Sequence, residues 1–275
     1  MKNKNFKKYC LLCRNSSFKT LKEITKKPSK ETDFLIEKQK YKRIIKKCKT
    51  CGIFLNMHDY DLDFLYNKIY NQKTYENNLT EHFDVIMSLP FSKSDNKQRV
   101  ERINNYFIQK LKSTKHISVL DVGSGLCVFL AELKKYYADV TCIDPSHKAI
   151  KHAKDYVGIS NTIHGNFYDI TIDKKYDLIT FNKVLEHVKN PVEFLLKAKS
   201  LLNHNGCIYI ELPDGDYASK SGGFIDREEF FIEHYSIFNL LSFEYLVNKS
   251  GLNIQQVQSI HEPSDKFTIY GFLSI

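Results

Sequence analysis

Apolar and polar residues follow a regular order from residue 117 to the C-terminus. Short runs rich in β-branched residues are typical of buried strands, and most of the stretches between them have the spacing of amphipathic helices. We predict strands at 117–122, 140–143, 162–164, 176–181 and 207–212, and intervening helices at 128–136, 146–156 and 191–202. This alternation is typical of a parallel, doubly wound sheet.

The last 35 residues continue the pattern with one helix and two strands. We expect the helix at 242–249 and the strands at 254–259 and 267–274, which indicates a hairpin at one edge of the sheet. The predicted fold class is therefore α/β, with a Rossmann-like, doubly wound, seven-stranded sheet.

Two helical patterns precede the first strand. Residues 97–112 carry an apolar face and begin after Ser94-Asp95, a suitable cap, and residues 61–70 have helical spacing among several tyrosines. Both could form a lid over the sheet, although a tyrosine-rich helix is more often core. We divide the chain into an N-terminal module (1–57), a helical connector (58–116) and a larger domain (117–275).

The N-terminal module contains two C-x-x-C pairs separated by 34 residues. Four thiolates in two such knuckles suit tetrahedral Zn²⁺ in a closed structural site, which would help a short segment to fold. The alternative is four ordinary buried or redox cysteines. We expect a hairpin between the pairs, with strands at 34–36 and 41–45. The predicted zinc ligands are Cys10, Cys13, Cys48 and Cys51.

Positive charge is concentrated in the same module. Residues 1–57 hold 17 Lys and Arg against 4 Asp and Glu, whereas the remaining residues hold 24 against 28. Such a module could contact RNA or another polyanion, or it could be a solvated lysine-rich surface. No apolar stretch has the length of a signal sequence or a membrane span, so we expect a cytoplasmic protein.

The first strand of the larger domain runs into a glycine-containing turn, Asp121-Val122-Gly123-Ser124-Gly125. Ligands of doubly wound sheets bind beyond the carboxyl ends of the strands, and glycines let the backbone approach them closely. A carboxylate before the glycines would repel a pyrophosphate but suits a cationic amino-acid ligand. Asp144-Pro145 ends the second strand, where an acid can bind both ribose hydroxyls. Its alternative role is to cap the next helix, for which Ser146 is better placed.

Two further strand ends carry candidate binding residues. Asn166-Phe167 follows the third strand and suits the edge and face of an adenine. The fourth strand continues into Asn182 and the sequence Leu185-Glu186-His187.

These motifs together resemble class I S-adenosylmethionine-dependent methyltransferases over about residues 95–275. The resemblance implies that S-adenosylmethionine is the methyl donor and S-adenosylhomocysteine the product. It places the glycines and Asn182 near the methionine moiety, Asp144 at the ribose, and Glu186 and His187 near the reacting centre. The implied cofactor-binding residues are Asp121, Gly123, Gly125, Asp144, Pro145, Asn166, Phe167, Asn182 and Glu186.

The double C-x-x-C module followed by such a domain resembles bacterial sugar methyltransferases, including C-methyltransferases of nucleotide-linked deoxysugars. Those C-methyltransferases usually carry a further C-terminal domain, whereas this sequence ends after the seventh strand. We therefore expect O- or N-methylation of a sugar or nucleotide-linked sugar for a surface polysaccharide.

Methyl transfer often requires a base to remove a proton from the acceptor. The pair Glu233-His234 resembles an acid–histidine pair of small-molecule methyltransferases, and a histidine can accept a proton from a hydroxyl at neutral pH. His187 is the second candidate, with a positioning role on the cofactor side. A purely structural role for His234 is an open alternative.

Two other functions are alternatives to the hypothesis of sugar methylation. An rRNA or tRNA base methyltransferase could dock RNA through the basic module, since phosphate contacts need Lys and Arg. Base methylation, however, commonly uses an N-P-P-Y-like motif where this chain has Asn182-Lys183-Val184-Leu185. The third possibility is a non-catalytic protein that binds the cofactor or a partner.

Overall fold

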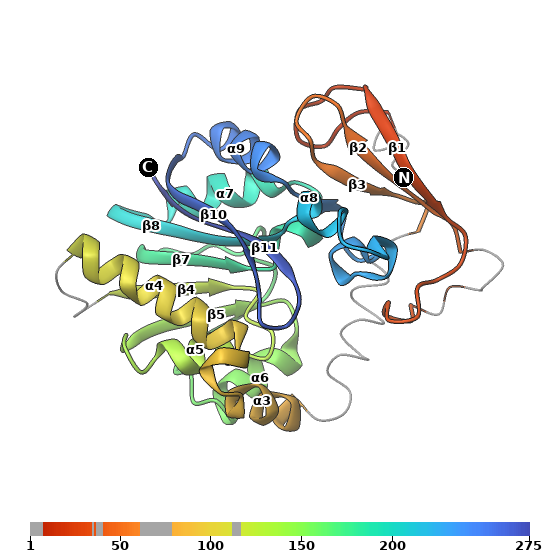
Figure 1. The fold of residues 1–275 in the computed structure, drawn as a ribbon. Helices are drawn as coiled ribbons and strands as arrows, with labels where there is room; N and C mark the ends of the chain where they lie inside the picture. Colours follow the sequence, from red (N-terminus) through yellow and green to blue (C-terminus); the bar gives the residue numbers. More distant parts are fainter. Residues whose placement is uncertain (1–7, 35, 37–40, 61–78, 112–116) are drawn as a thin grey trace.

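The computed structural model describes residues 8–34, 36, 41–60, 79–111 and 117–275. Its main element is a seven-stranded sheet in the order β10-β11-β8-β7-β4-β5-β6 (Figure 1). The five strands from β8 to β6 are parallel, and β11 is antiparallel to both β8 and β10. This arrangement confirms the predicted fold and the edge hairpin. The strands are β4 (Ser118–Val122), β5 (Asp139–Asp144), β6 (Asn161–His164), β7 (Tyr176–Asn182), β8 (Leu202–Pro213), β10 (Asn253–His261) and β11 (Phe267–Ser274).

Helices cover both faces of this sheet. Successive side chains of a strand point to opposite faces, so Leu178 packs with α4, α5 and α6 on one side, and Ile179 packs with α7 and α9 on the other. The two faces therefore contribute to separate buried clusters. The helices are α4 (Asp95–Leu111), α5 (Val128–Leu133), α6 (His147–Asp155), α7 (Pro191–Ser200) and α9 (Leu240–Lys249).

The connector contains one predicted helix and one that the sequence analysis missed. α4 has the expected position, and the Ser94 hydroxyl accepts a hydrogen bond from the Lys97 amide at 3.2 Å. α3 (Leu79–Ser88) was not predicted, and none of its residues is buried. The helix expected at 61–70 lies outside the described residues. Short elements complete the chain: η3 (Phe91–Lys93), η4 (Leu185–His187), α8 (Gly215–Ala218), η5 (Phe224–Asp226) and η6 (Glu228–Phe230).

The N-terminal module forms a second, four-stranded antiparallel sheet in the order β1-β2-β3-β9. Its strands are β1 (Phe18–Ile24), β2 (Arg43–Cys48), β3 (Phe54–Met57) and β9 (Ser236–Ile237). The hairpin between the cysteine pairs therefore exists, but the prediction of its strands was wrong. Phe34 is outside any strand, and Phe18–Ile24 takes the place of the predicted 34–36 strand. The predicted 41–45 strand overlaps only the start of β2.

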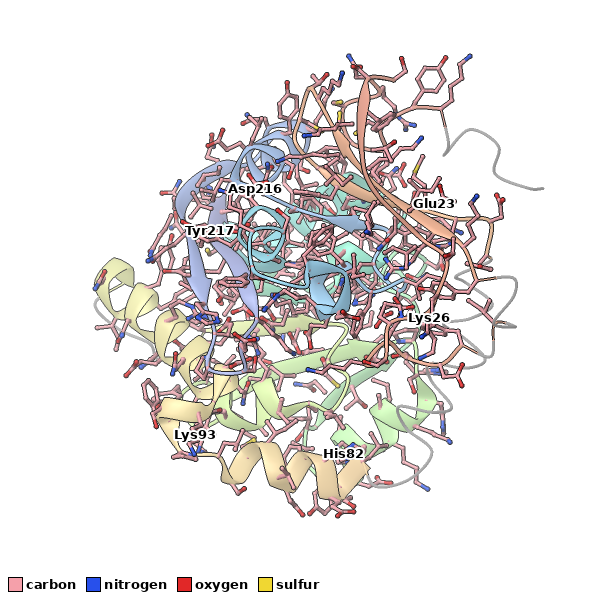
Figure 2. All side chains as sticks on the ribbon, turned by 45° about the vertical axis from the view of Figure 1, so that its right-hand side comes forward. Glu23, Lys26, His82, Lys93, Asp216 and Tyr217 are labelled. Carbon is pink, nitrogen blue, oxygen red and sulfur yellow. The ribbon has the colours of Figure 1, made fainter. Side chains whose placement is uncertain are left out.

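The fourth strand of the module sheet comes from the far end of the chain. β9 pairs with β3 through Phe54–Ile237 and Leu55–Ser236. An ion pair of 2.5 Å joins Lys47 of β2 to Asp216 of α8. Figure 2 labels Asp216. Both contacts attach the module to the carboxyl-end side of the large sheet. Within the described ranges, no helix is long and apolar enough to cross a membrane.

Candidate functional site

The turn after β4 has a backbone that only glycine accommodates well. Gly123 and Gly125 have φ values of +71° and +52°. A Cβ at position 123 would lie 2.8 Å from Cγ2 of Val184, which directly precedes η4. The turn and the segment after β7 are thus in close contact, since β4 and β7 are parallel neighbours. This places the glycine turn beside the Glu186-His187 segment.

Asp144 at the end of β5 connects that strand to the glycine turn. Its Oδ2 accepts a hydrogen bond from the Gly125 amide at 2.9 Å, and its Oδ1 accepts one from the Ser146 amide at 2.8 Å. Ser146 caps α6 by accepting a bond from the Ala149 amide, as its position predicts. Asp144 therefore also orders the turn that the sequence analysis assigned to the cofactor. Burial raises the pKa of its carboxyl, and the two amide donors counteract this effect.

Asp121 is buried beneath the same turn. Its Oδ1 accepts hydrogen bonds from the Thr180 hydroxyl at 2.6 Å and the Asn182 amide at 2.9 Å. Burial raises the pKa of Asp121 to about 6, although these donors lower it. Oδ1 of Asn182 is buried and has no hydrogen-bond partner among the described residues. An unsatisfied acceptor at the carboxyl end of β7 fits the ammonium group of an amino-acid ligand.

The residues assigned to the adenine lie after β6. Phe167 is buried against Phe181 and Phe194, with ring centroids 5.7 and 5.8 Å away. Asn166 is exposed, and its side chain accepts a hydrogen bond from the Tyr168 amide at 3.0 Å. The Pro145 carbonyl lies 3.1 Å from Nε2 of His164, so Pro145 and this loop are adjacent. The three sequence-assigned residues Pro145, Asn166 and Phe167 are thus brought to one end of the sheet.

Glu186, His187 and His234 come together although the two histidines are 47 positions apart in the sequence. The two imidazole centroids are 4.7 Å apart with an interplanar angle of 71°. Nδ1 of His187 lies 3.2 Å from the Glu233 carbonyl, and Nδ1 of His234 lies 2.9 Å from the Glu229 carbonyl. A backbone bond of 2.9 Å from the Tyr235 amide to the Glu186 carbonyl fixes the two segments together.

Burial shifts the pKa values of this cluster. It raises the pKa of Glu186 to about 7 and lowers that of His234 to about 4. The pKa of His187 is also lowered, by burial and by the neighbouring His234. Burial raises the pKa of Glu233 to about 7, and its carboxylate is under the influence of Glu31 and Arg43 of the module. Both histidines are therefore neutral at physiological pH.

The module holds the segment that carries His234, which the sequence analysis did not foresee. Nδ2 of Asn56 donates to the Phe231 and His234 carbonyls, each at 2.9 Å. Nη1 of Arg43 donates to the Phe230 carbonyl at 2.6 Å, and Nη2 pairs with Glu31 at 2.9 Å.

The sequence signal for the supporting role of Arg43 is its place in the alternation of side chains along β2. Arg43 is on the same side of β2 as the fully buried Ile45, and its own side chain is fully buried.

A second buried charged network, also missed, joins α4 to β8. Glu211 forms ion pairs with Arg99 at 2.6 Å and Arg102 at 2.9 Å. Burial alone would raise the pKa of Glu211, but the two guanidinium groups lower it below its usual value. Glu262 lies 3.9 Å from Arg102, and burial raises its pKa to about 7. The arginines occupy the polar face of an amphipathic helix, where the sequence predicts solvent.

The four predicted zinc ligands also come together. Their sulfur atoms all lie within 4.8 Å of one another, with Cys10–Cys51 at 3.6 Å and Cys13–Cys48 at 3.5 Å. Three of the four side chains are buried. A closed set of four thiolates fits a structural zinc site.

Comparisons with known proteins agree with this architecture. The ubiquinone biosynthesis O-methyltransferase of Rickettsia bellii is 32% identical over 146 residues, which cover 48% of this chain and 60% of that protein. The corresponding enzyme of Pasteurella multocida is 30% identical over 121 residues, covering 38% and 50%. The chain thus spans about half to three-fifths of the length of these relatives.

Solved structures show the same fold at low sequence identity. The plantazolicin methyltransferase BpumL in complex with SAH has a TM-score of 0.57 and 18% identity, covering 78% of this chain and 93% of that one. Magnesium protoporphyrin IX methyltransferase from Synechocystis PCC 6803 has a TM-score of 0.54 and 14% identity, covering 74% and 98%. Residues 93–257 match the family described as "Methyltransferase domain". With more than half of its length in this match, the chain belongs to the methyltransferase-domain family and has the class I α/β fold of S-adenosylmethionine-dependent methyltransferases.

Proposed function

We propose that this protein transfers a methyl group from S-adenosylmethionine to a hydroxyl or amino group of a sugar or nucleotide-linked sugar. The observation that carries the proposal is the cluster of Glu186, His187 and His234 beside the glycine turn. An acceptor bound at this cluster would lie next to the donor site. The curated relatives are O-methyltransferases by name, which favours a hydroxyl acceptor.

The glycine turn and the strand ends around it would hold the donor. Asp144 is proposed to bind the ribose, and the buried Oδ1 of Asn182 the methionine ammonium. Gly123 lets the turn approach Val184 closely, because a Cβ at this position would lie 2.8 Å from its Cγ2. The proposed cofactor-binding residues are Asp121, Gly123, Gly125, Asp144, Pro145, Asn166, Phe167, Asn182 and Glu186.

S-adenosylmethionine supplies a methyl group on a cationic sulfur, and an acceptor hydroxyl must lose its proton as it takes that methyl. We assign the uptake of this proton to the catalytic group of His187, Glu233 and His234. His187 and His234 are neutral at physiological pH and can therefore act as acceptors. Glu233 contributes its carbonyl to the orientation of His187.

The module is proposed to bind structural Zn²⁺ through its four cysteines and to position the catalytic loop. Arg43 and Asn56 support this role, since both contact the carbonyls of residues 230–234. We propose that the chain consists of three parts, with boundaries after residues 57 and 116. Strand β9 belongs to the third part but pairs with β3 in the sheet of the module.

The test is methyl transfer from labelled S-adenosylmethionine into a bacterial extract that is separated into RNA, protein and small-metabolite pools. We expect label in the small-metabolite or glycan pool with the wild type and with the control variant His204→Ala, which alters an exposed histidine at the other end of β8. His234→Ala should lose most of the transfer and keep its affinity for S-adenosylhomocysteine. Label in RNA would refute the sugar assignment in favour of base methylation. Binding of the cofactor with no transfer to any pool would indicate a non-catalytic protein.

A further inference from the structure

We propose that Glu229 is a positioning residue, which holds the His234 imidazole with its proton on Nδ1 and its lone pair on Nε2. Nδ1 of His234 lies 2.9 Å from the Glu229 carbonyl. A carbonyl only accepts hydrogen bonds, so this contact requires the proton on Nδ1 of the neutral ring. The bond at one ring nitrogen thereby sets the state of the other nitrogen, which is then able to accept the proton of a hydroxyl. This consequence rests on the proposed function, in which His234 takes up that proton.

The carboxylate of Glu229 is buried and both of its oxygens are bonded. Glu229 is 2% exposed. Its Oε1 accepts hydrogen bonds from the Phe267 amide at 2.8 Å and from Nη2 of Arg227 at 3.1 Å, and its Oε2 accepts one from Nε of Arg227 at 3.1 Å. A guanidinium that forms two bonds to one carboxylate fixes the orientation of both groups. The side chain of Glu229 therefore holds its own residue, and with it the carbonyl that faces His234.

Arg227 and Phe267 connect Glu229 to the hairpin of β10 and β11. Nη1 of Arg227 donates to Oδ2 of Asp265 at 3.3 Å, and the guanidinium carbon lies 4.6 Å from the centroid of the Phe267 ring. The Phe267 carbonyl accepts a hydrogen bond of 2.9 Å from the amide of Asp214, which directly follows β8. The bonds of the Glu229 carboxylate thus attach η6 to the large sheet.

The module supports the same loop at different atoms. Asn56 donates to the His234 carbonyl and Arg43 to the Phe230 carbonyl, so both hold the main chain of the loop. The Glu229 carbonyl is instead the group that bonds to the His234 ring, and this ring forms no other hydrogen bond in the described part of the chain. Loss of the Glu229 carboxylate should therefore release the ring without detaching the loop from the module.

Only one of the two neutral tautomers of His234 can act as the base. In the transfer, the acceptor oxygen forms a bond to the methyl carbon and gives its proton to Nε2, and the electron pair of the broken carbon–sulfur bond stays on sulfur. A ring that already carries its proton on Nε2 has no lone pair there to accept another. A neutral histidine in water carries its proton mostly on Nε2, so a ring released from the Glu229 carbonyl should shift to the inactive tautomer.

The test is nuclear magnetic resonance of the full chain with ¹⁵N-labelled histidine rings near neutral pH. His234→Gln identifies the signals of His234 among the ten histidines. We expect a protonated Nδ1 and an unprotonated Nε2 in the wild type and in the control Glu228→Ala, which alters the neighbouring carboxylate that pairs with Lys266 at 2.9 Å. In Glu229→Ala the signals should shift toward the tautomer with the proton on Nε2. The shift should be smaller in Glu229→Gln, which keeps an oxygen for the Phe267 amide.

Methyl transfer is measured in parallel, from labelled S-adenosylmethionine into the extract pool that the wild type labels. Glu229→Ala should lower the rate at saturating S-adenosylmethionine at least about tenfold, because a displacement of about 1 Å in a catalytic site can cost about a hundredfold. The KM for S-adenosylmethionine and the affinity for S-adenosylhomocysteine should not change, which would show that the donor site is folded. Glu229→Gln should recover part of the rate.

Two spectra would overturn the proposal. One is a wild-type His234 with its proton on Nε2, and the other is the same tautomer of His234 in the wild type and in Glu229→Ala. Neither spectrum depends on methyl transfer, so the proposed transfer itself would still stand. A shifted tautomer with an unchanged rate would refute proton uptake by His234 and leave the positioning of its ring by Glu229 intact. A shifted tautomer with a lower rate would support both.

Discussion

Replacing Arg43 with methionine should loosen the loop of residues 230–235, which carries His234, although residue 43 lies in the N-terminal module. Methionine is apolar and fills much of the same volume, but it removes every donor of the guanidinium group. Arg43 pairs with Glu31 at 2.9 Å, donates to the Phe230 carbonyl at 2.6 Å and to Asn56 Oδ1 at 2.7 Å. Glu31 in turn accepts the Ile232 amide at 2.8 Å. The variant would therefore leave the Glu31 carboxylate buried and unpaired beneath residues 230–232.

The magnitude follows from the burial of this ion pair. Both side chains are 0% exposed, and removing one partner of a buried pair costs about 3–5 kcal/mol. Because about 1.4 kcal/mol corresponds to a tenfold change in an equilibrium constant, opening of the loop should become more than about a hundredfold more frequent. The double variant Arg43→Met/Glu31→Gln removes the unpaired charge and should recover part of this loss.

The assay is amide hydrogen exchange of the full chain, read at Ile232 and Tyr235. Their protection should fall more than about a hundredfold in Arg43→Met and less in the double variant. The protection of the Ser146 amide, near the proposed donor site, should be unaffected. The defect of Arg43→Met should shrink as the pH falls from 8 to 5.5. Burial raises the pKa of Glu31 and Arg43 lowers it, so without Arg43 the carboxyl takes up a proton more readily and the unpaired charge disappears. Unchanged protection of the loop in Arg43→Met would refute the view that the module positions it.

Three further predictions concern the other parts of the site. Asp144→Ala should weaken S-adenosylhomocysteine binding at least about tenfold in calorimetry, because it removes the proposed ribose acceptor and the 2.9 Å bond to Gly125; equal affinity would remove Asp144 from the donor site. Cys48→Ser should abolish zinc binding at the proposed four-cysteine site, measured by mass spectrometry, and should reduce hydrogen-exchange protection in β3 and β9. Retention of one zinc per chain in this variant would contradict the four-thiolate site. The unfolding free energy of the wild type relative to His234→Gln should fall by at most about 1.4 kcal/mol per pH unit between pH 6.5 and 4. The stability falls because burial lowers the folded-state pKa of His234 to about 4, so the unfolded chain binds the proton first as the pH decreases. If urea titrations give a difference in unfolding free energy between the wild type and His234→Gln that does not vary with pH, the prediction is wrong.

The larger domain was predictable because its inner strands β4, β5, β7 and β8 are largely buried on both faces and most of its strands are separated by amphipathic helices. That pattern identified all seven strands within a few residues, except that β8 begins five residues earlier than expected, at Leu202. β1 was missed because it is an edge strand with four of its seven residues exposed, and it lacks an apolar alternation. The 34–36 strand was predicted instead from an apolar run, in which Phe34 packs into a cluster without pairing in a sheet.

The sequence by itself determined the local features of this protein: the glycine turn, the acid that ends β5, the cap at Ser146 and the paired cysteines. Each depends on backbone conformation or on spacing over a few residues, which the sequence encodes directly. Only the tertiary structure decided which distant groups meet, namely His187 with His234, Arg43 with the Phe230 carbonyl, and β9 with β3. These contacts join residues that are 47 to 187 positions apart, or strands that are distant in the sequence. Burial in the folded chain then sets the protonation of His187 and His234. Neither the pairing nor the burial is a property of any local segment, so both depend on the folded chain.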